Sequence, residues 1–226
     1  MYNFWTVKVI RFIPLVFIFG VVIAMLFYPG GNIHNPDQIG YSLTNNFLSD
    51  LGGINSRSDE TNVISFLFFN ASMLVFALGG VGFLFVPRLF KADKINYYLA
   101  LIGSAFFFFG SFFFAAVGLT PHDLYLNEHV FFAINGFRLL VPAAIFYFIV
   151  LLRSPVKNSY SLLTFIFLLS TFAYVVFQIV GESPLLSPEA MSRQVIMQKL
   201  ITLVHLISIF SLSYAFNSQL KNMDIN

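Results

Sequence analysis

The chain has 226 residues, of which 58% are hydrophobic and only 10% are charged. Soluble domains carry about 25% charged residues, so this composition excludes a protein whose whole surface faces water. The sequence has no cysteine, which excludes disulfides, thiolate metal sites and cysteine nucleophiles. The net charge of +2 is too small to indicate a nucleic-acid partner. The composition predicts that a lipid bilayer is most of the solvent.

Six apolar stretches are long enough to cross a bilayer, which takes about 20 residues of helix. Turn-forming residues bound several of them, such as Pro29 after the first and Pro121 after the third. We therefore predict an all-α fold, a bundle of six transmembrane helices that forms one integral membrane domain over residues 1–226. The predicted spans are approximately 12–28, 63–86, 97–119, 130–152, 162–180 and 195–216.

Two of the predicted helices are preceded by capping signals. Ser56 and Asp59 have the spacing of a capping box before the second span. Ser187, Pro188 and Glu189 place a cap, a proline and an acid before the sixth. Both signals predict where these helices begin.

The basic residues of the loops alternate along the chain between two sides. Arg57 and Arg193 lie on one side, and eight lie on the other, namely Lys8, Arg11, Arg88, Lys91, Lys94, Arg153, Lys157 and Lys221. Because cytoplasmic loops are enriched in Lys and Arg, the pattern predicts a multi-pass protein of the cytoplasmic (inner) cell membrane with both termini in the cytoplasm.

The first outer loop contains a periodic segment. Leu43, Phe47 and Leu51 recur at every fourth position, and the opposing polar stripe consists of Ser42, Asn45, Asn46 and Ser49. This spacing predicts a short amphipathic helix at the outer interface.

Polar residues within the spans cluster in their outer halves. The residues concerned are Asn70, Arg138, Gln198, Lys199 and His205. Arg138 lies roughly 12 Å into the fourth span at 1.5 Å per residue. Intramembrane cations usually face the bundle interior or a cavity, so Arg138 either belongs to a site or pairs with Asp50, Asp123 or Glu128.

Three histidines could together supply nitrogen ligands to a catalytic zinc ion. They are His122, His129 and His205, with Asp50 or Asp123 as a base and Ser49 as a hydroxyl. His205 would lie about 15 Å deep if its helix starts at 195, and nearer the surface if that helix starts near 187. The alternatives are that His205 is an interhelical hydrogen-bond partner and that Asp123 belongs to a capping box with Thr120.

Several segments resemble the six-helix bacterial and archaeal membrane family catalogued as domain of unknown function 998. The segments are Tyr41-Ser42, Asn46-Phe47-Leu48-Ser49-Asp50-Leu51-Gly52, Phe69-Asn70, and Gly118-Leu119-Thr120-Pro121-His122-Asp123 followed by His129. Gln198-Lys199 stands where a Gln-Arg or Glu-Arg pair is usual, which loses the guanidinium fork. The resemblance supports the fold and implies site positions at Asn46, Ser49, Asp50, Asn70, Asp123, His129 and Lys199. More remotely, the Ser, Asp and His residues resemble those of the alkaline ceramidase type of intramembrane hydrolase, which has seven spans and paired histidines on the last helix.

Three functions are compatible with these residues. The first is binding of an anionic lipid or small ligand, or a membrane scaffold, with Arg138 and Lys199 accepting the anion and Asn46, Asn70 and Gln198 near it. The second is a zinc-dependent hydrolase of a lipid amide or ester. The third is a small transporter, favoured by Pro142 within the fourth span but opposed by the apolar inner halves. The expected partners are membrane lipids.

Overall fold

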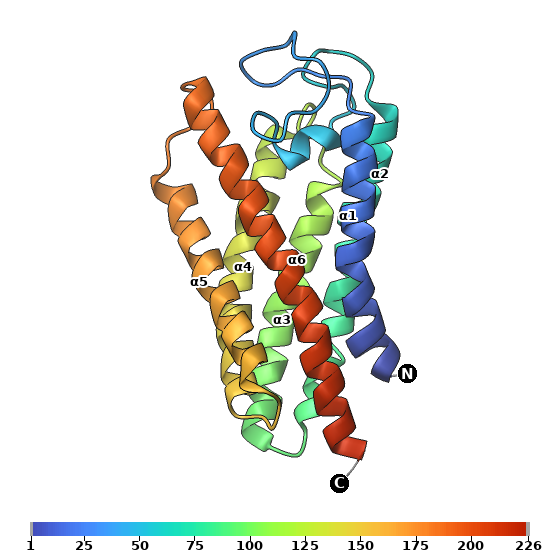
Figure 1. Cartoon of the computed structure of the whole chain (residues 1–226), viewed down its shortest axis with the longest axis vertical. Helices are drawn as coiled ribbons and strands as arrows, with labels where there is room; N and C mark the ends of the chain where they lie inside the picture. The colour runs from blue at the N-terminus through green and yellow to red at the C-terminus, as the bar shows by residue number, and fades with distance from the viewer. Residues whose placement is uncertain (1, 225–226) are drawn as a thin grey trace.

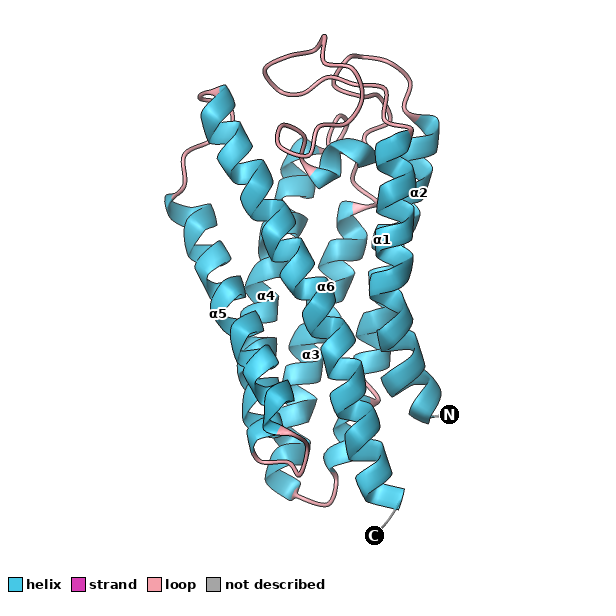
Figure 2. Cartoon of the chain, in the orientation of Figure 1, coloured by secondary structure: helices cyan, strands magenta, loops and turns pink. Residues whose placement is uncertain are grey.

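The computed structural model describes residues 2–224 as a bundle of long helices (Figure 1). A π-helix, Phe4–Val9, continues into α1, Ile10–Leu26. The other long helices are α2 (Val63–Phe83), α3 (Lys94–Val117), α4 (Leu126–Leu152), α5 (Asn158–Val180) and α6 (Pro188–Asp224). Two short 3-10 helices are Leu48–Gly52 and Val86–Phe90. The prediction of an all-α fold is confirmed, because residues 2–224 contain isolated β-bridges but no strand (Figure 2).

Within the described residues, six helices are long and apolar enough to cross a membrane. This fits the prediction of a multi-pass membrane protein. The predicted spans lie largely inside these helices, and the main difference is that α6 begins at Pro188 rather than near residue 195. Ser187 caps it as predicted, since its hydroxyl accepts a hydrogen bond from the Ala190 N–H at 3.1 Å.

The helices form a closed ring. Each helix from α1 to α5 packs against the next in sequence, and α6 packs against both α5 and α1. Both chain ends lie at one end of the bundle (Figure 1). We call this the terminal end, and we call the opposite end, which carries the connections 27–62, 118–125 and 181–187, the long-loop end.

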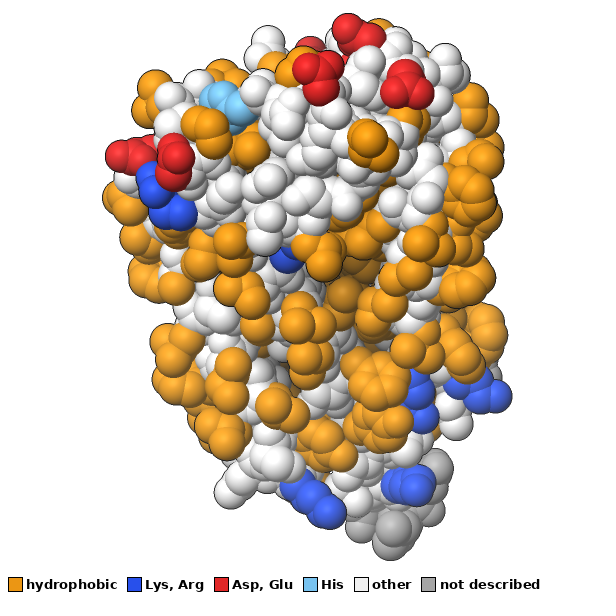
Figure 3. Space-filling view, turned by 45° about the horizontal axis from the view of Figure 1, so that its top comes forward, with side chains coloured by type: hydrophobic (Ala, Val, Ile, Leu, Met, Phe, Trp, Pro, Cys, Tyr) orange, Lys and Arg blue, Asp and Glu red, His pale blue; other side chains and the backbone are white. Residues whose placement is uncertain are grey.

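The surface separates apolar from charged groups along the bundle axis. On the face drawn in Figure 3, apolar side chains cover much of the middle, and the carboxylates in view lie toward the long-loop end. Lys or Arg side chains lie without carboxylates toward the terminal end and beside carboxylates at the upper left. This separation matches the loop charges on which the topology prediction rests.

The half of the bundle near the terminal end is closed by aromatic packing. The rings of Phe83 and Phe107 stack with centroids 3.8 Å apart, and Tyr147 and Phe216 meet Phe83 at 5.5 and 5.7 Å. Ser104 hydrogen-bonds the Phe83 carbonyl at 2.7 Å and the Tyr147 hydroxyl at 2.6 Å. These side chains are buried in the core, so this half is filled.

The predicted amphipathic helix in the first long loop is wrong, because only Leu48–Gly52 is helical there and it is a 3-10 turn. The polar side chains Asn46 and Asp50 are buried, with 0% and 1% of their surface exposed, whereas Leu43 is 63% exposed. The reason is that the buried carboxylate collects hydrogen-bond donors from the loop, which outweighs the apolar periodicity.

Both predicted capping boxes are also wrong. Ser56 belongs to a turn in which the Asp59 N–H bonds its carbonyl at 3.1 Å, and α2 begins only at Val63. Thr120 hydrogen-bonds back to the Ala116 carbonyl at 2.9 Å, so it does not cap the next helix. Both residues satisfy turns instead, which short hydroxyl side chains also do.

Candidate functional site

The first long loop is organised around the buried carboxylate of Asp50. Its Oδ1 accepts a hydrogen bond from Arg57 Nε at 3.0 Å, and its Oδ2 accepts from the Phe47 N–H at 2.9 Å and from Asn46 Nδ2 at 3.2 Å. An ion pair reinforced by neutral donors satisfies a carboxylate that has no access to water. The loop fold and the charge of Asp50 therefore depend on each other.

Asn46 connects this carboxylate to the rest of the loop. Its amide nitrogen also donates to the Gly31 carbonyl at 2.7 Å. Its side-chain oxygen accepts from Gln38 Nε2 at 2.6 Å and from the Ser42 N–H at 3.0 Å. One buried amide thus holds three separate stretches of the loop.

Two residues of α6 attach the loop to the bundle. Gln198 Oε1 accepts a hydrogen bond from the Leu48 N–H at 2.8 Å. Lys199 donates to the Asn46 carbonyl and lies 5.3 Å from the centre of the Tyr41 ring. The lysine is therefore committed to the loop, and it lines neither of the cavities described below.

The loop is also seated on α2. Asn70 Nδ2 donates to the Gly52 carbonyl at 3.2 Å. A Cβ at Gly52 would lie 2.6 Å from the Phe69 ring and 2.7 Å from Asn70 Oδ1, so the loop approaches α2 this closely only because residue 52 is glycine. Phe69, Asn70 and Gly52 therefore together hold the loop against α2.

The connection between α3 and α4 completes the site. Asp123 accepts hydrogen bonds from the Ile54 and Asn55 N–H groups at 3.2 and 3.0 Å. His122 is buried, with Nε2 4.0 Å from Asp50 Oδ1. Burial, reinforced by the positive charge of Arg57, lowers the pKa of His122 to about 4, so this imidazole is neutral at pH 7.

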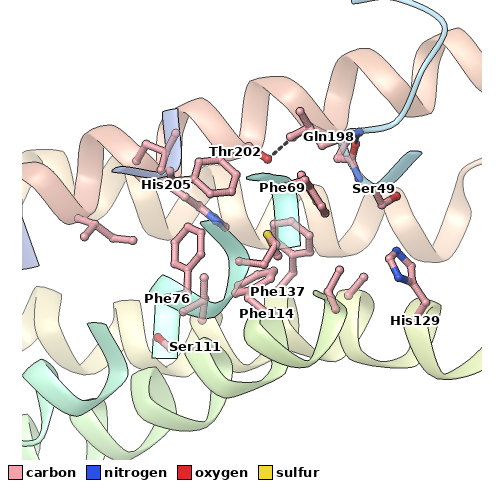
Figure 4. A pocket seen from close by; sticks show the side chains of 18 of the residues that line it. Ser49, Phe69, Phe76, Ser111, Phe114, His129, Phe137, Gln198, Thr202 and His205 are labelled. Carbon is pink, nitrogen blue, oxygen red and sulfur yellow. Dashed lines mark hydrogen bonds between the residues drawn. The ribbon is translucent and has the colours of Figure 1, made fainter. Parts of the chain in front are cut away.

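Two cavities adjoin at this end of the bundle. The larger, of about 1110 Å³, lies beneath the long loops, and we call it the vestibule. Its polar lining includes one cation, Arg57, the neutral side chains of His122, Gln178 and Gln194, and the carboxylates of Asp59, Asp123 and Glu182. The smaller, of about 90 Å³, lies inside the bundle, and we call it the apolar chamber; it is lined by phenylalanines 17, 69, 76, 107, 114 and 137. Ser49, His129, Ala133 and Gln198 line both cavities, so they form the border between them. Figure 4 shows Ser49, His129 and Gln198 among the side chains that line the apolar chamber.

His129 has a defined tautomer at this border. Its Nδ1 lies 2.7 Å from the Thr120 carbonyl oxygen, which can only accept, so Nδ1 carries the proton in the neutral ring. Nε2 is then an unprotonated acceptor. The Ser49 hydroxyl has no hydrogen bond to any described residue and lines the same two cavities.

His205 lies apart from the other two histidines. Its Nε2 pairs with the Thr171 hydroxyl at 2.9 Å, and its ring packs between Phe137 and Phe167 at 5.3 and 5.0 Å. The interhelical interpretation of His205 is thereby confirmed. The rings of His122 and His129 are 6.2 Å apart, and no group of three potential ligands within residues 2–224 could hold a metal ion. The predicted three-histidine zinc centre is not formed.

Arg138 is the other sequence-predicted residue that lies away from the site. Its side chain is exposed on α4 and lines neither cavity. Within the described residues it forms no ion pair with Asp50, Asp123 or Glu128, so the predicted pairing is wrong. The expectation that Arg138 and Lys199 converge on one anion is not met either.

Sequence reasoning missed the role of Arg57, which it counted only as a loop charge. A signal was present, because Arg57 is the only cation in the loop that contains Asp50. Its N–H also donates to the Tyr28 hydroxyl at 3.0 Å. Burial and the charge of Asp50 raise the pKa values of Tyr28 and Tyr41 above the usual range of tyrosine, so both phenols stay neutral as part of this network.

Comparison of the chain with known protein families, with curated proteins and with solved structures found no match. The resemblance to domain of unknown function 998 and the remoter resemblance to the alkaline ceramidases therefore stay predictions.

The Asp50 network leads to a prediction about stability. Asp50→Ala removes three hydrogen bonds at a buried position, one of them the ion pair with Arg57, so we expect the free energy of unfolding to fall by about 3 kcal/mol. Thermal unfolding of the purified protein in detergent measures this as a lower midpoint. The matched control is Asp37→Ala, the same change at an exposed position of the same loop, which leaves the midpoint unchanged. Equal midpoints for the two variants would show that the loop does not depend on the carboxylate.

Proposed function

We propose that this protein binds an amphiphilic molecule, such as a lipid with an anionic headgroup, at the long-loop end of the bundle. The polar head occupies the vestibule, and the end of the apolar chain enters the apolar chamber. The observation that carries the proposal is that a cavity of mixed polar and apolar lining and a phenylalanine-lined cavity adjoin across a shared border of four residues.

The vestibule has the groups that a polar head requires. Arg57 uses Nε for Asp50, which leaves its two terminal nitrogens without a hydrogen bond to any described residue. Gln178 Oε1 and His122 Nδ1 are buried and likewise have no partner within residues 2–224. Of these groups, the partly exposed guanidinium of Arg57 lines the vestibule, so its terminal nitrogens are available to a polar ligand there. A guanidinium suits a phosphate or a carboxylate.

The apolar chamber suits the end of a hydrocarbon chain. A cavity needs about 10–15 Å³ to hold one water, and this one measures about 90 Å³. Its lining is mostly apolar, and the polar side chains Thr202 and His205 within it are already hydrogen-bonded in the protein. Away from the border residues, water therefore finds few partners there, and an apolar group is favoured.

Ala133 allows a direct test, because it borders both cavities and has a small side chain. We expect Ala133→Phe to block the passage and to lower the amount of lipid retained by the purified protein at least about tenfold. Mass spectrometry of extracted lipids, normalised to protein, measures the occupancy. Ala173→Phe is the matched control, since it makes the same change at an exposed position of α5 and should retain the wild-type amount. A wild-type protein without retained amphiphile, or equal retention in both variants, contradicts the proposal.

We further propose that the long-loop end faces outward and that both termini are cytoplasmic, in the cytoplasmic (inner) cell membrane. Support comes from the eight-to-two distribution of loop Lys and Arg residues and from the two termini lying at one end of the bundle (Figure 1).

The absence of cysteine from the sequence makes the orientation testable with single cysteines. We expect Ile39→Cys, at a position 96% exposed in the first long loop, to react with a membrane-impermeant maleimide in intact cells. Lys157→Cys, at the opposite end, should react only after the cells are opened. The reverse pattern would establish the opposite orientation.

A second candidate function is hydrolysis of an ester in the bound amphiphile, favoured by the unprotonated Nε2 of His129 and the unpaired hydroxyl of Ser49 at the same border. Ser49 Oγ would attack the ester carbonyl carbon while His129 Nε2 takes its proton. The carbon–oxygen bond then breaks, and the leaving alcohol takes the proton from His129. Water attacks the acyl-serine in the same way, releasing the acid and restoring Ser49. None of these reaction steps uses a metal ion.

The hydrolase candidate has its own test. We expect the protein to hydrolyse a p-nitrophenyl ester of a medium-chain fatty acid and to react with a fluorophosphonate, and Ser49→Ala to abolish both while retaining wild-type lipid. Ser42→Ala, a serine of the same loop that lines neither cavity, keeps both reactions. Activity that survives Ser49→Ala removes this candidate without affecting the binding proposal.

A further inference from the structure

One face of α4 points away from the bundle along its whole length. Phe131, Arg138, Ile145 and Leu152 recur at every seventh position, and all four are exposed. Residues seven apart lie on nearly the same side of an α-helix. We call this row the α4 outer stripe.

The middle of the α4 outer stripe is polar. Arg138 lies twelve residues after Leu126 and fourteen before Leu152, which places it about 18 Å from the start of the helix. Asn135, one turn earlier, donates to the Phe131 carbonyl at 2.8 Å, and its Oδ1 lies 3.4 Å from Arg138 Nη1. Pro142, one turn later, has no N–H to give to the Arg138 carbonyl. The Arg138 guanidinium, the Asn135 amide and the Arg138 carbonyl, to which Pro142 donates no hydrogen bond, therefore lie together on a face that apolar residues otherwise cover.

The environment of Arg138 differs from that of the other cations within the spans. Lys199 bonds a loop carbonyl and faces the Tyr41 ring. Arg11 bonds Ser213 at 3.2 Å and lies 4.0 Å from the Tyr214 ring. Within residues 2–224, Arg138 has only one long hydrogen bond, to a neutral amide. A charge at mid-membrane is costly unless it has a partner. Arg138 therefore needs a charged partner that the described part of this chain does not supply.

We propose that the α4 outer stripe binds a transmembrane helix of another protein that carries an Asp or Glu at mid-membrane depth. A carboxylate there would pair with Arg138 in two parallel hydrogen bonds and could accept from Asn135. The apolar residues above and below would pack along the partner helix.

A second copy of this chain does not meet the requirement. Its acidic residues lie in the loops or in the first or last turn of a helix, at positions 37, 50, 59, 60, 93, 123, 128, 182, 189 and 224. None of them is at the depth of Arg138, and a symmetric contact between two α4 helices would place Arg138 against its own copy.

The test uses defined peptides in vesicles of neutral phosphatidylcholine. The probe is a synthetic transmembrane helix of about 22 Leu and Ala residues with one central Glu, and its control has Leu at that position. We expect the protein to bind the Glu peptide about tenfold more tightly than the Leu peptide, as measured by fluorescence energy transfer. Arg138→Leu should remove this preference, and Arg138→Glu should transfer it to a peptide with a central Lys.

Three results would overturn the proposal. The first is equal binding of the Glu and Leu peptides. The second is a preference that appears only when anionic lipid is added, which would identify the occupant as a lipid headgroup. The third is efficient disulfide cross-linking of Ile145→Cys to itself in membranes, with none for the control Phe172→Cys on the exposed face of α5, which would identify it as a second copy. Lipid retention at the long-loop end should be the same in Arg138→Leu as in wild type, which separates this surface from the amphiphile site.

Discussion

The long-loop end of this protein depends on the burial of one carboxylate. Asp50 is 1% exposed, so its charge can persist only if donors surround it. Arg57, Asn46 and the Phe47 N–H supply them, which brings the Asn46–Phe47 stretch and the stretch around Arg57 to the same point. The loop in turn roofs the vestibule. The shape of the vestibule beneath the loop therefore depends on how the charge of Asp50 is satisfied.

The sequence was sufficient to predict the helices, because their signal is physical and local. About 20 apolar residues must form a helix to satisfy their backbone in lipid, and each of the six observed helices contains such a stretch. The cap at Ser187 was predictable for the same reason, since Ser-Pro-Glu is a local signal. The conformation of the first long loop could not be predicted from such local signals. Its conformation is decided by contacts between Asp50, Arg57 and Asn46, and by Lys199, which is 153 residues from Asn46. An amphipathic period was present at Leu43, Phe47 and Leu51, but these distant contacts overrode it.

The site residues show the same division. Asn46, Ser49, Asp50, Asn70, Asp123, His129 and Gln198 were all predicted, and the structure brings them to the long-loop end. Most of them hold the loop, and only Ser49, His129 and Gln198 line both cavities. Residue type and approximate depth were enough to identify the region. The sequence did not reveal which way each side chain points around its helix axis. That orientation decides that His205 faces Thr171 and that Arg138 faces away from the bundle.

The position of the cavities follows from how the two halves of the bundle are packed. Apolar side chains alone give little reason for helices to associate in lipid, so association depends on close packing and on interhelical hydrogen bonds. Near the terminal end both conditions hold, with stacked rings at Phe83 and Phe107 and the Ser104–Tyr147 hydrogen bond. Toward the long-loop end, α6 bonds α5 directly through His205 and Thr171, and it bonds the first long loop through Gln198 and Lys199. The 3-10 turn Leu48–Gly52 thus lies between α6 and α2, and both cavities border it at Ser49.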